Sequence, residues 1–272
     1  MISPGELIPP PGFESDSLAL DDYAFLVSST RKNDMGDDWA SLHAGFILGE
    51  IEEAMYQHGP GLNLLLSNEY DYIIERRGVD VEELRDDVAD EVADMLWFGF
   101  SAAEYLEQTP GSLVVKGLAS HGVIGLSEPH NFNDLQKIVV DHADEVRFRS
   151  KYSLECGDES DTGLISLEDS PGYALNRVTG RLAHALLGDD DSPRLRTASD
   201  LEPQSAIDDA LGEYICVIAY IATSRLNRDI ETLAWHNIEK LIERERWGKP
   251  DKELAETFSP QKSTGYPHKL LT

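Results

Sequence analysis

Hydrophobic residues recur along most of this chain with the spacing of α-helices. Ile47, Ile51 and Ala54, for example, are three or four positions apart, which places them on one helix face. Few segments show the alternation with a period of two that a half-buried strand requires. The pattern therefore predicts an all-α protein. The predicted helices cover residues 17–31, 38–57, 64–76, 79–108, 132–149, 172–187, 203–227 and 229–247.

Glycine, proline and polar residues separate the predicted helices. The second helix ends at the His-Gly-Pro-Gly sequence of residues 58–61, and Gly78 precedes the long fourth helix. Residues 110–131 are rich in Gly, Ser and Val, so we expect a connection there, with a short strand at 113–117. Residues 153–171 have the composition of a polar loop.

A weak internal repeat divides the chain into two parts. The sequence LGEIEEA (48–54) aligns with TGRLAHA (179–185), and residues 89–106 align with residues 208–226. Each part would be a small helical unit with its own leading helix. The expected organisation is a unit at 15–110, a second unit at 130–248, and flexible tails at 1–14 and 249–272.

Composition restricts the partners of the protein. The 272 residues carry a formal net charge of −28, and such a surface repels nucleic-acid phosphates and anionic membranes. We therefore expect no nucleic-acid partner and no membrane partner, and no apolar run reaches the roughly 18 residues of a membrane span. The two cysteines, Cys156 and Cys216, form no Cys-x-x-Cys pattern, which favours a reducing cytoplasm.

Two pairs of acidic residues are the candidates for chemistry. Glu50 and Glu53 are three positions apart on one predicted helix, and Glu91 and Asp94 have the same spacing on another. Residues with this spacing share a helix face, so four carboxylates would meet if the two helices pack together. Carboxylate oxygens are ligands that Mg²⁺ prefers. The spacing alone decides little, because 51 of the 272 residues are acidic.

The surroundings of Asp94 strengthen this interpretation. It lies in the sequence ADEVADMLWFGF, which is apolar nearly all round the helix and is therefore expected to be buried. A buried carboxylate costs several kcal/mol unless it is paired, protonated or bound to a metal. Basic residues are scarce between the two acidic pairs, so a divalent cation is the expected partner.

The segments LGEIEEA and DEVADMLWF resemble the ExxE and ExxD motifs of the all-α nucleoside triphosphate pyrophosphohydrolases. This superfamily includes MazG, the dimeric dUTPases and the dCTP pyrophosphatases, and the resemblance covers residues 35–108 and 172–248. It implies a MazG-like four-helix bundle, here formed as an intrachain pseudo-dimer. It also implies cleavage of a nucleoside triphosphate to a monophosphate and pyrophosphate by water attack on the α-phosphorus. The implied ligands of Mg²⁺, with Mn²⁺ as the alternative ion, are Glu50, Glu53, Glu91 and Asp94.

Other residues take roles from the same resemblance. Glu53 is our choice of general base, and whether Asp87 or Asp90 also joins the site stays open. Residues 229–248 resemble the last helix of the family, in which an asparagine precedes a lysine and another basic residue. The residues expected to bind the substrate are Trp39, Lys240, Arg244 and Arg181.

The second unit departs from the pattern. Arg181, His184, Ala210 and Glu213 stand where the alignment places the four acids of the first unit. We therefore expect a degenerate copy that completes the bundle and leaves one active site per pseudo-dimer. Whether the protein also forms a homodimer, and which nucleotide it cleaves, stays open.

A catalytically inactive helical binding or regulatory module of the same fold is the main alternative. A di-iron bundle requires Glu-x-x-His on two helices, and no histidine of this chain follows a glutamate at that spacing. A P-loop is absent, and Asp141-His142 reverses the His-Asp order of the HD phosphohydrolases.

Overall fold

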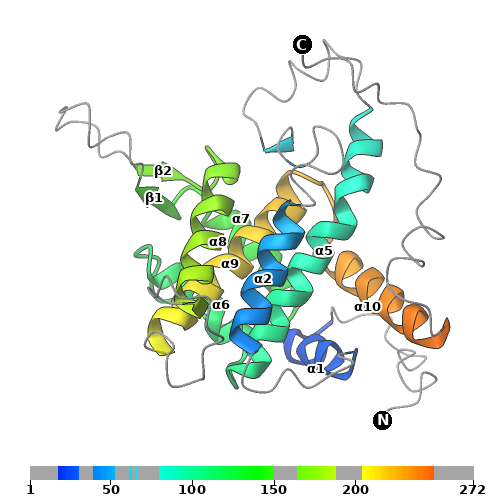
Figure 1. The fold of residues 1–272 in the computed structure, drawn as a ribbon. Coiled ribbons are helices and arrows are strands. Elements are labelled where there is room, and N and C mark those ends of the chain that lie inside the picture. Colours follow the sequence, from blue (N-terminus) through cyan, green and yellow to red (C-terminus); the bar gives the residue numbers. More distant parts are fainter. Residues whose placement is uncertain are drawn as a thin grey trace.

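The computed structural model of the chain describes residues 18–30, 39–52, 62, 65–66, 80–149, 164–187 and 204–247. These residues are mostly helical, which confirms the predicted all-α class (Figure 1). The helices are α1 (Leu20–Thr30), α2 (Trp39–Glu52), α5 (Val81–Tyr105), α6 (Pro110–Ala119), α7 (Phe132–Asp141), α8 (Pro171–Leu187), α9 (Gln204–Ser224) and α10 (Ile230–Trp247). The strands β1 (Arg147–Arg149) and β2 (Leu164–Ser166) form one short antiparallel sheet.

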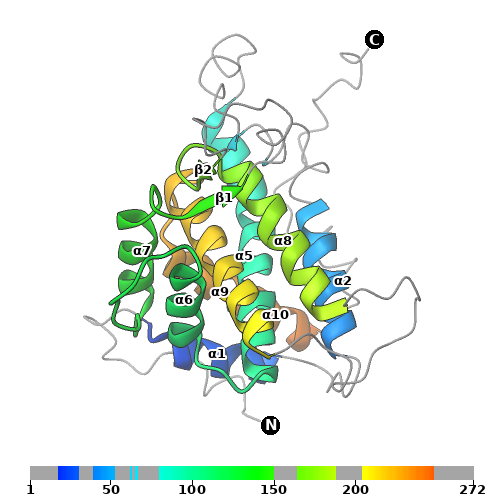
Figure 2. The same cartoon turned by 90° about the vertical axis from the view of Figure 1, so that its left-hand side faces the viewer.

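Four helices pack around the common core of the molecule. The helix α5 contacts α2 and α9, and α8 contacts the same two helices from the other side. Figure 2 shows α9 in the middle, with α6 and α7 on one side and α8 and α2 on the other. Every residue of α9 from Ala210 to Ala222 is buried, because neighbouring helices cover it all round.

The outer helices make contacts that correspond in pairs. The helix α1 packs against α5, and α7 packs against α9. The helix α6, which follows α5, packs against α9, whereas α10, which follows α9, packs against α5. Ala19 and Asn131, the residues just before α1 and α7, form an antiparallel bridge with each other. These pairs occur in the same order along the chain on either side of the two segments of the weak sequence repeat.

The loops after α5 and α9 also share an uncommon backbone conformation. Glu107 has a φ of 54° and Asn227 a φ of 53°, and each lies two residues before the cap of the next helix. Residues other than glycine seldom adopt a positive φ. The caps themselves are Thr109, whose hydroxyl accepts the Ser112 N–H at 3.4 Å, and Asp229, whose carboxylate accepts an N–H at 2.8 Å.

Three sequence predictions are wrong. The polar loop expected at 153–171 contains the strand β2, because Leu164–Ser166 pairs with Arg147–Arg149. The expected strand at 113–117 lies inside α6, because Thr109 caps a helix there and Pro110 suits its first turn. The expected helix at 132–149 ends at Asp141, and residues 147–149 form β1. The predicted helix at 64–76 falls almost entirely outside the described residues, and the tails at 1–14 and 249–272 fall wholly outside them. Among the described helices, none has both the length and the apolar character that crossing a membrane demands.

A close contact between α6 and α9 in the core depends on two glycines. A Cβ atom added at Gly117 of α6 would overlap the backbone of Gly212 and Glu213 in α9. One added at Gly212 would overlap the carbonyl oxygen of Leu113. The two backbones therefore touch without side chains between them, and this contact fixes the position of α6 over α9.

We expect Gly117→Ala to lower the free energy of unfolding by about 1–3 kcal/mol, because α6 and α9 must move apart to fit the methyl group. The matched control is Gly180→Ala in α8, where an added Cβ meets nothing within 4 Å. This control should gain up to about 1 kcal/mol from better helix propensity. Urea denaturation measures both values, and equal effects at the two positions would contradict the close contact.

Candidate metal centre

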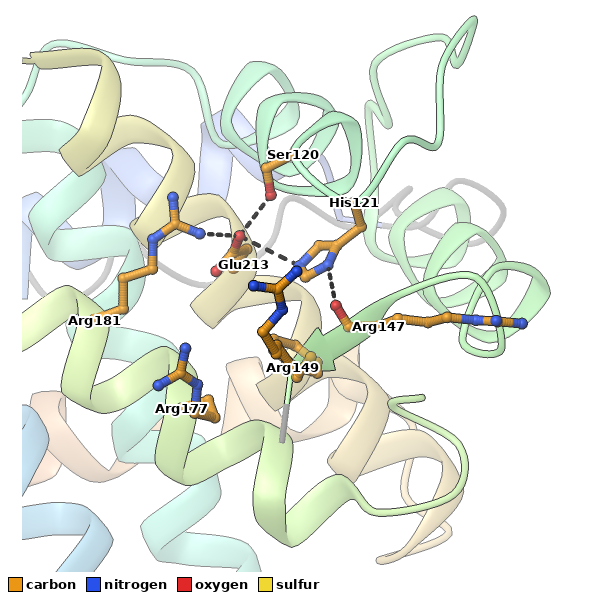
Figure 3. Close-up of a pocket in the computed structure, with 8 residues that line it drawn as sticks. Ser120, His121, Arg147, Arg149, Arg177, Arg181 and Glu213 are labelled. Atoms are coloured by element: carbon orange, nitrogen blue, oxygen red, sulfur yellow. Dashed lines mark hydrogen bonds and ion pairs between the residues drawn. The ribbon is translucent and has the colours of Figure 1, made fainter. Parts of the chain in front are cut away.

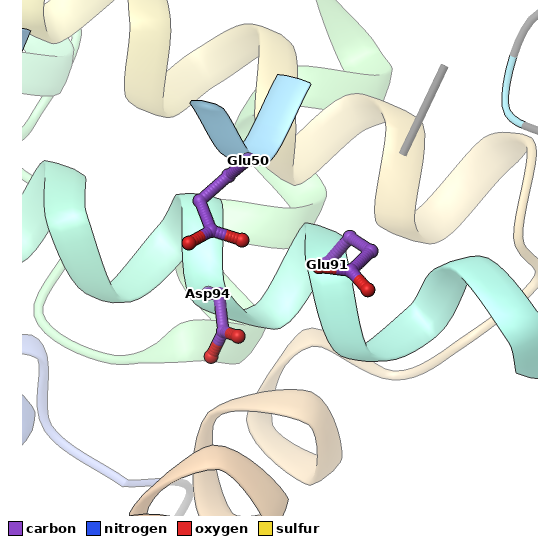
Figure 4. A group of neighbouring side chains, drawn as sticks. All are labelled: Glu50, Glu91 and Asp94. Carbon is purple, nitrogen blue, oxygen red and sulfur yellow. The ribbon is translucent and has the colours of Figure 1, made fainter. Parts of the chain in front are cut away.

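Three of the predicted acidic residues meet between α2 and α5. Glu50 lies on α2, and Glu91 and Asp94 lie one turn apart on α5 (Figure 4). One carboxylate oxygen from each residue lies within 4.8 Å of the other two, and each residue is half-buried. Glu53, the fourth predicted ligand and the predicted base, lies outside the described residues. The structure therefore brings three acids to one place.

The local sequence of α5 explains why these acids point toward a neighbouring helix. Val92, Ala93, Met95 and Leu96 are buried, so this part of the helix is covered on most sides. The acidic positions between them lie at the edge of the core, where water reaches them only in part. Carboxylates at such an edge keep their charge only with polar or cationic partners.

The helix α10 supplies two such partners to Asp94. The Lys240 ammonium lies 2.9 Å from one carboxylate oxygen, and the Asn237 side-chain amide donates a hydrogen bond to the other. Lys240, which we expected to bind substrate, thus contacts the carboxylate cluster directly. One turn earlier, His236 lies 3.1 Å from Asp90. Asp87 and Asp90 do not belong to the described group of converging oxygens.

Two buried tyrosines lie close enough to the carboxylate cluster for its negative charge to raise their pKa values. Burial raises the pKa of Tyr23, and the negative charge of Asp94 raises it further. Burial likewise raises the pKa of Tyr214, with a smaller contribution from Glu50. The Tyr214 hydroxyl donates to the Met95 carbonyl at 3.0 Å. Both phenols therefore stay protonated and neutral near the three acids.

The donor set fits a hard divalent cation. Oxygen atoms bound to one Mg²⁺ at about 2.0–2.1 Å are roughly 3–4 Å apart, and the oxygens here lie within 4.8 Å of one another. Small side-chain rotations would bring all three to one ion. Magnesium usually binds to a few carboxylates and keeps several waters, so three acids leave positions for water or phosphate oxygens.

The remaining predicted residues are placed elsewhere or are not described. The side chains of Trp39 and Arg244 lie outside the described residues. Arg181, on α8, donates a hydrogen bond to the carboxylate of Glu213 on α9. Its guanidinium is therefore engaged between α8 and α9, and no described contact joins it to the three acids.

Glu213 on α9 is another carboxylate buried among the helices, and its side chain is 3% exposed. Besides Arg181, it accepts a hydrogen bond of 2.5 Å from the Ser120 hydroxyl and faces the His121 ring at 3.3 Å (Figure 3). Burial acts to raise the pKa of this carboxyl. The hydrogen bonds from His121 and Ser120 and the charge of Arg181 outweigh burial, so its pKa is lowered.

Sequence reasoning missed Ser120 and His121. The signal that could have found Ser120 was an alignment of the two helix caps. When Thr109 is aligned with Asp229, Ser120 aligns with Lys240. Each residue then follows its cap by the same interval, and Ser120 contacts Glu213 on α9 whereas Lys240 contacts Asp94 on α5.

Comparison of the chain with protein-family models, with curated proteins and with solved structures finds no match. What the cluster can bind is therefore judged from its own donors and their spacing.

We expect Glu213→Gln to lower the free energy of unfolding by about 1–3 kcal/mol near neutral pH, because the charged hydrogen bonds of the carboxylate are lost. The folded state lowers the pKa of Glu213, so the carboxylate stabilises the fold above the usual value of 4.5. This contribution is lost as the pH falls through the folded-state pKa.

The difference between the wild type and the variant should therefore shrink below pH 4.5. Urea denaturation at several pH values measures it. Glu128→Gln, at an exposed position, is the control and should change the stability by less than about 0.5 kcal/mol. A difference that stays constant on acidification would contradict the stabilising role of the charge.

Proposed function

We propose that this chain is a magnesium-dependent nucleotide pyrophosphohydrolase. It cleaves a nucleoside triphosphate to the monophosphate and pyrophosphate, by attack of water on the α-phosphorus. The observation that carries the proposal is the convergence of Glu50, Glu91 and Asp94 from two neighbouring helices, with oxygens within 4.8 Å of one another. The resemblance of both segments to the ExxE and ExxD motifs gives the reaction class.

The three acids would hold Mg²⁺ and repel a triphosphate without it. When bound, the ion offsets the phosphate charges and lowers the pKa of a coordinated water. Lys240 lies at the edge of the cluster and would contact a phosphate oxygen while remaining close to Asp94. Glu53 follows Glu50 by one helical turn in sequence, which is the reason for proposing it as the general base.

The fold proposed for this activity is a MazG-like pseudo-dimer within one chain. The paired helix contacts, the bridge between Ala19 and Asn131, and the matching φ angles of Glu107 and Asn227 support it. In this arrangement α10 of the second unit brings Lys240 to Asp94 of the first unit. The second unit has Arg181 and Ala210 at the positions of Glu50 and Glu91. We therefore propose one metal site per chain.

An inactive binding module is the second candidate, and one contact favours it. The Lys240 ammonium lies 2.9 Å from Asp94, where it provides a positive charge that a metal would otherwise supply. A module of this kind would keep the helix packing and bind no metal. A hydrolysis assay separates the two functions.

The test is hydrolysis of a nucleotide panel with Mg²⁺, scored for both monophosphate and pyrophosphate. The panel contains dUTP, dCTP, purine triphosphates, modified nucleotides and alarmones. We expect at least one to be cleaved, and we expect EDTA to abolish the activity because the metal is removed. Asp94→Asn should lower the rate at least about 100-fold, since a ligand of the metal is lost.

Glu83→Gln is the matched control, because Glu83 is exposed in the first turn of the same helix. Its activity should equal that of the wild type. Full activity in Asp94→Asn would show that the site is wrong, and no cleavage of any nucleotide would refute the hydrolase in favour of the binding module.

A further inference from the structure

A second group of charged side chains surrounds a cavity of about 200 Å³ where α6, α8, α9 and β1 meet (Figure 3). Four arginines line this cavity, in a chain that has only 23 basic against 51 acidic residues. Positive charge is therefore concentrated at one place on a strongly acidic protein. The cavity shares no residue with the carboxylate cluster of Glu50, Glu91 and Asp94.

Three of the four guanidinium groups point into the same space. Arg177 and Arg181 are one turn apart on α8 and therefore share a helix face. Arg149, at the end of β1, approaches them from across the cavity (Figure 3). The side chain of Arg147 extends away, and its Nε donates to the Asp144 carbonyl at 3.1 Å.

The backbone that carries these arginines is held in place. The Tyr173 hydroxyl donates to the Arg149 carbonyl at 2.7 Å, which ties β1 to α8. A ring nitrogen of His121 bonds to the Arg147 carbonyl at 2.9 Å, and the same ring packs edge-on against Phe148. The backbone positions of β1 and α8 are thus set before any ligand arrives, and only the arginine side chains remain to be ordered on binding.

The described residues neutralise this charge only in part, because Glu213 and the more distant Asp209 both act on Arg181. Glu213 pairs with Arg181 at the base of the cavity, whereas the described part of the chain places no carboxylate in ion-pair contact with Arg149 or Arg177. Like charges one helical turn apart repel each other and destabilise a helix. An anion bound between the three guanidinium groups would remove this repulsion.

We propose that this cavity binds a phosphate group, either as a free inorganic anion or as the end of a small phosphorylated molecule. Among the residues that line the cavity, three inward-pointing guanidinium groups face one carboxylate, and this excess of positive charge suits a phosphate that carries about −1.5 to −2. The planar fork of arginine suits phosphate oxygens. The volume is below the roughly 300–1,000 Å³ of pockets for drug-sized ligands, so the cavity takes the phosphate and leaves the rest of a larger ligand outside.

The register of the repeat supports the same conclusion. Arg181 and Glu213 align with Glu50 and Asp94 of the first unit. The repeat thus places Arg181, which lines the cavity, at the position of one acid of the carboxylate cluster, whereas Glu213 stays acidic. Arg149 and Arg177 have no counterpart among the four acids, so the positive charge of the cavity belongs to the second part of the chain alone. This inference does not depend on the hydrolase activity.

The test is isothermal titration calorimetry of the full chain with pyrophosphate, and separately with inorganic phosphate, in EDTA and at constant ionic strength. EDTA removes divalent ions, so the carboxylate cluster cannot bind the anion through a metal. We expect saturable binding to one site per chain. Arg149→Gln and Arg177→Gln should each weaken the affinity about tenfold or more, since a charged hydrogen bond is lost.

Two controls keep their affinity if the proposal is right. Lys137→Gln removes one positive charge from the exposed face of α7, and Asp94→Asn alters the carboxylate cluster. Thermal unfolding of each variant checks that it is folded. The proposal is overturned if neither anion binds the wild type, if Lys137→Gln weakens binding as much as Arg177→Gln, or if only Asp94→Asn abolishes it.

Discussion

The structure depends on providing hydrogen-bond or ion-pair partners for carboxylates on the central helices. The central helices α5 and α9 carry Asp94 and Glu213 among their covered acids, and an unpaired charge at a buried position would cost several kcal/mol. In both cases the outer helix that follows the other central helix supplies a partner. Lys240 of α10 reaches Asp94, and Ser120 at the end of α6 reaches Glu213. The packing of α6 on α9 and of α10 on α5 is therefore stabilised by these polar contacts as well as by apolar contacts.

The two carboxylates then differ in what else surrounds them, and this difference separates the two proposed sites. Glu50 and Glu91 add two acids beside Asp94, which makes an oxygen-rich cluster suited to a cation. Arg181 stands beside Glu213 instead, and the arginines of α8 and β1 add further positive charge. One helical framework would thus offer a cation site and an anion site at related positions. Substitutions at a few residues would be enough to change a cation site into an anion site, because the helix backbones already hold the side chains at the required positions.

Periodicity predicted most helices, since a helix that packs on one side must repeat its apolar residues at that spacing. It failed at residues 113–117, where a composition rich in Gly, Ser and Val indicated a connection with a short strand. The Thr109 cap and the close fit of Gly117 against α9 decide that segment, and the second of these is a tertiary contact. In the candidate site, the spacing of Glu91 and Asp94 predicted one shared face. The Ser120–Glu213 contact joins residues 93 positions apart, and only the folded chain brings them together.

The central claim is that Glu50, Glu91 and Asp94 bind one divalent cation. The most direct measurement is anomalous X-ray diffraction from crystals of the full chain grown with Mn²⁺, which replaces Mg²⁺ at oxygen sites and scatters anomalously. The account predicts an anomalous peak within bonding distance, about 2.0–2.4 Å, of an oxygen from each of the three acids. A saturated crystal with no peak at this cluster, or with peaks only at other acidic residues, would contradict it.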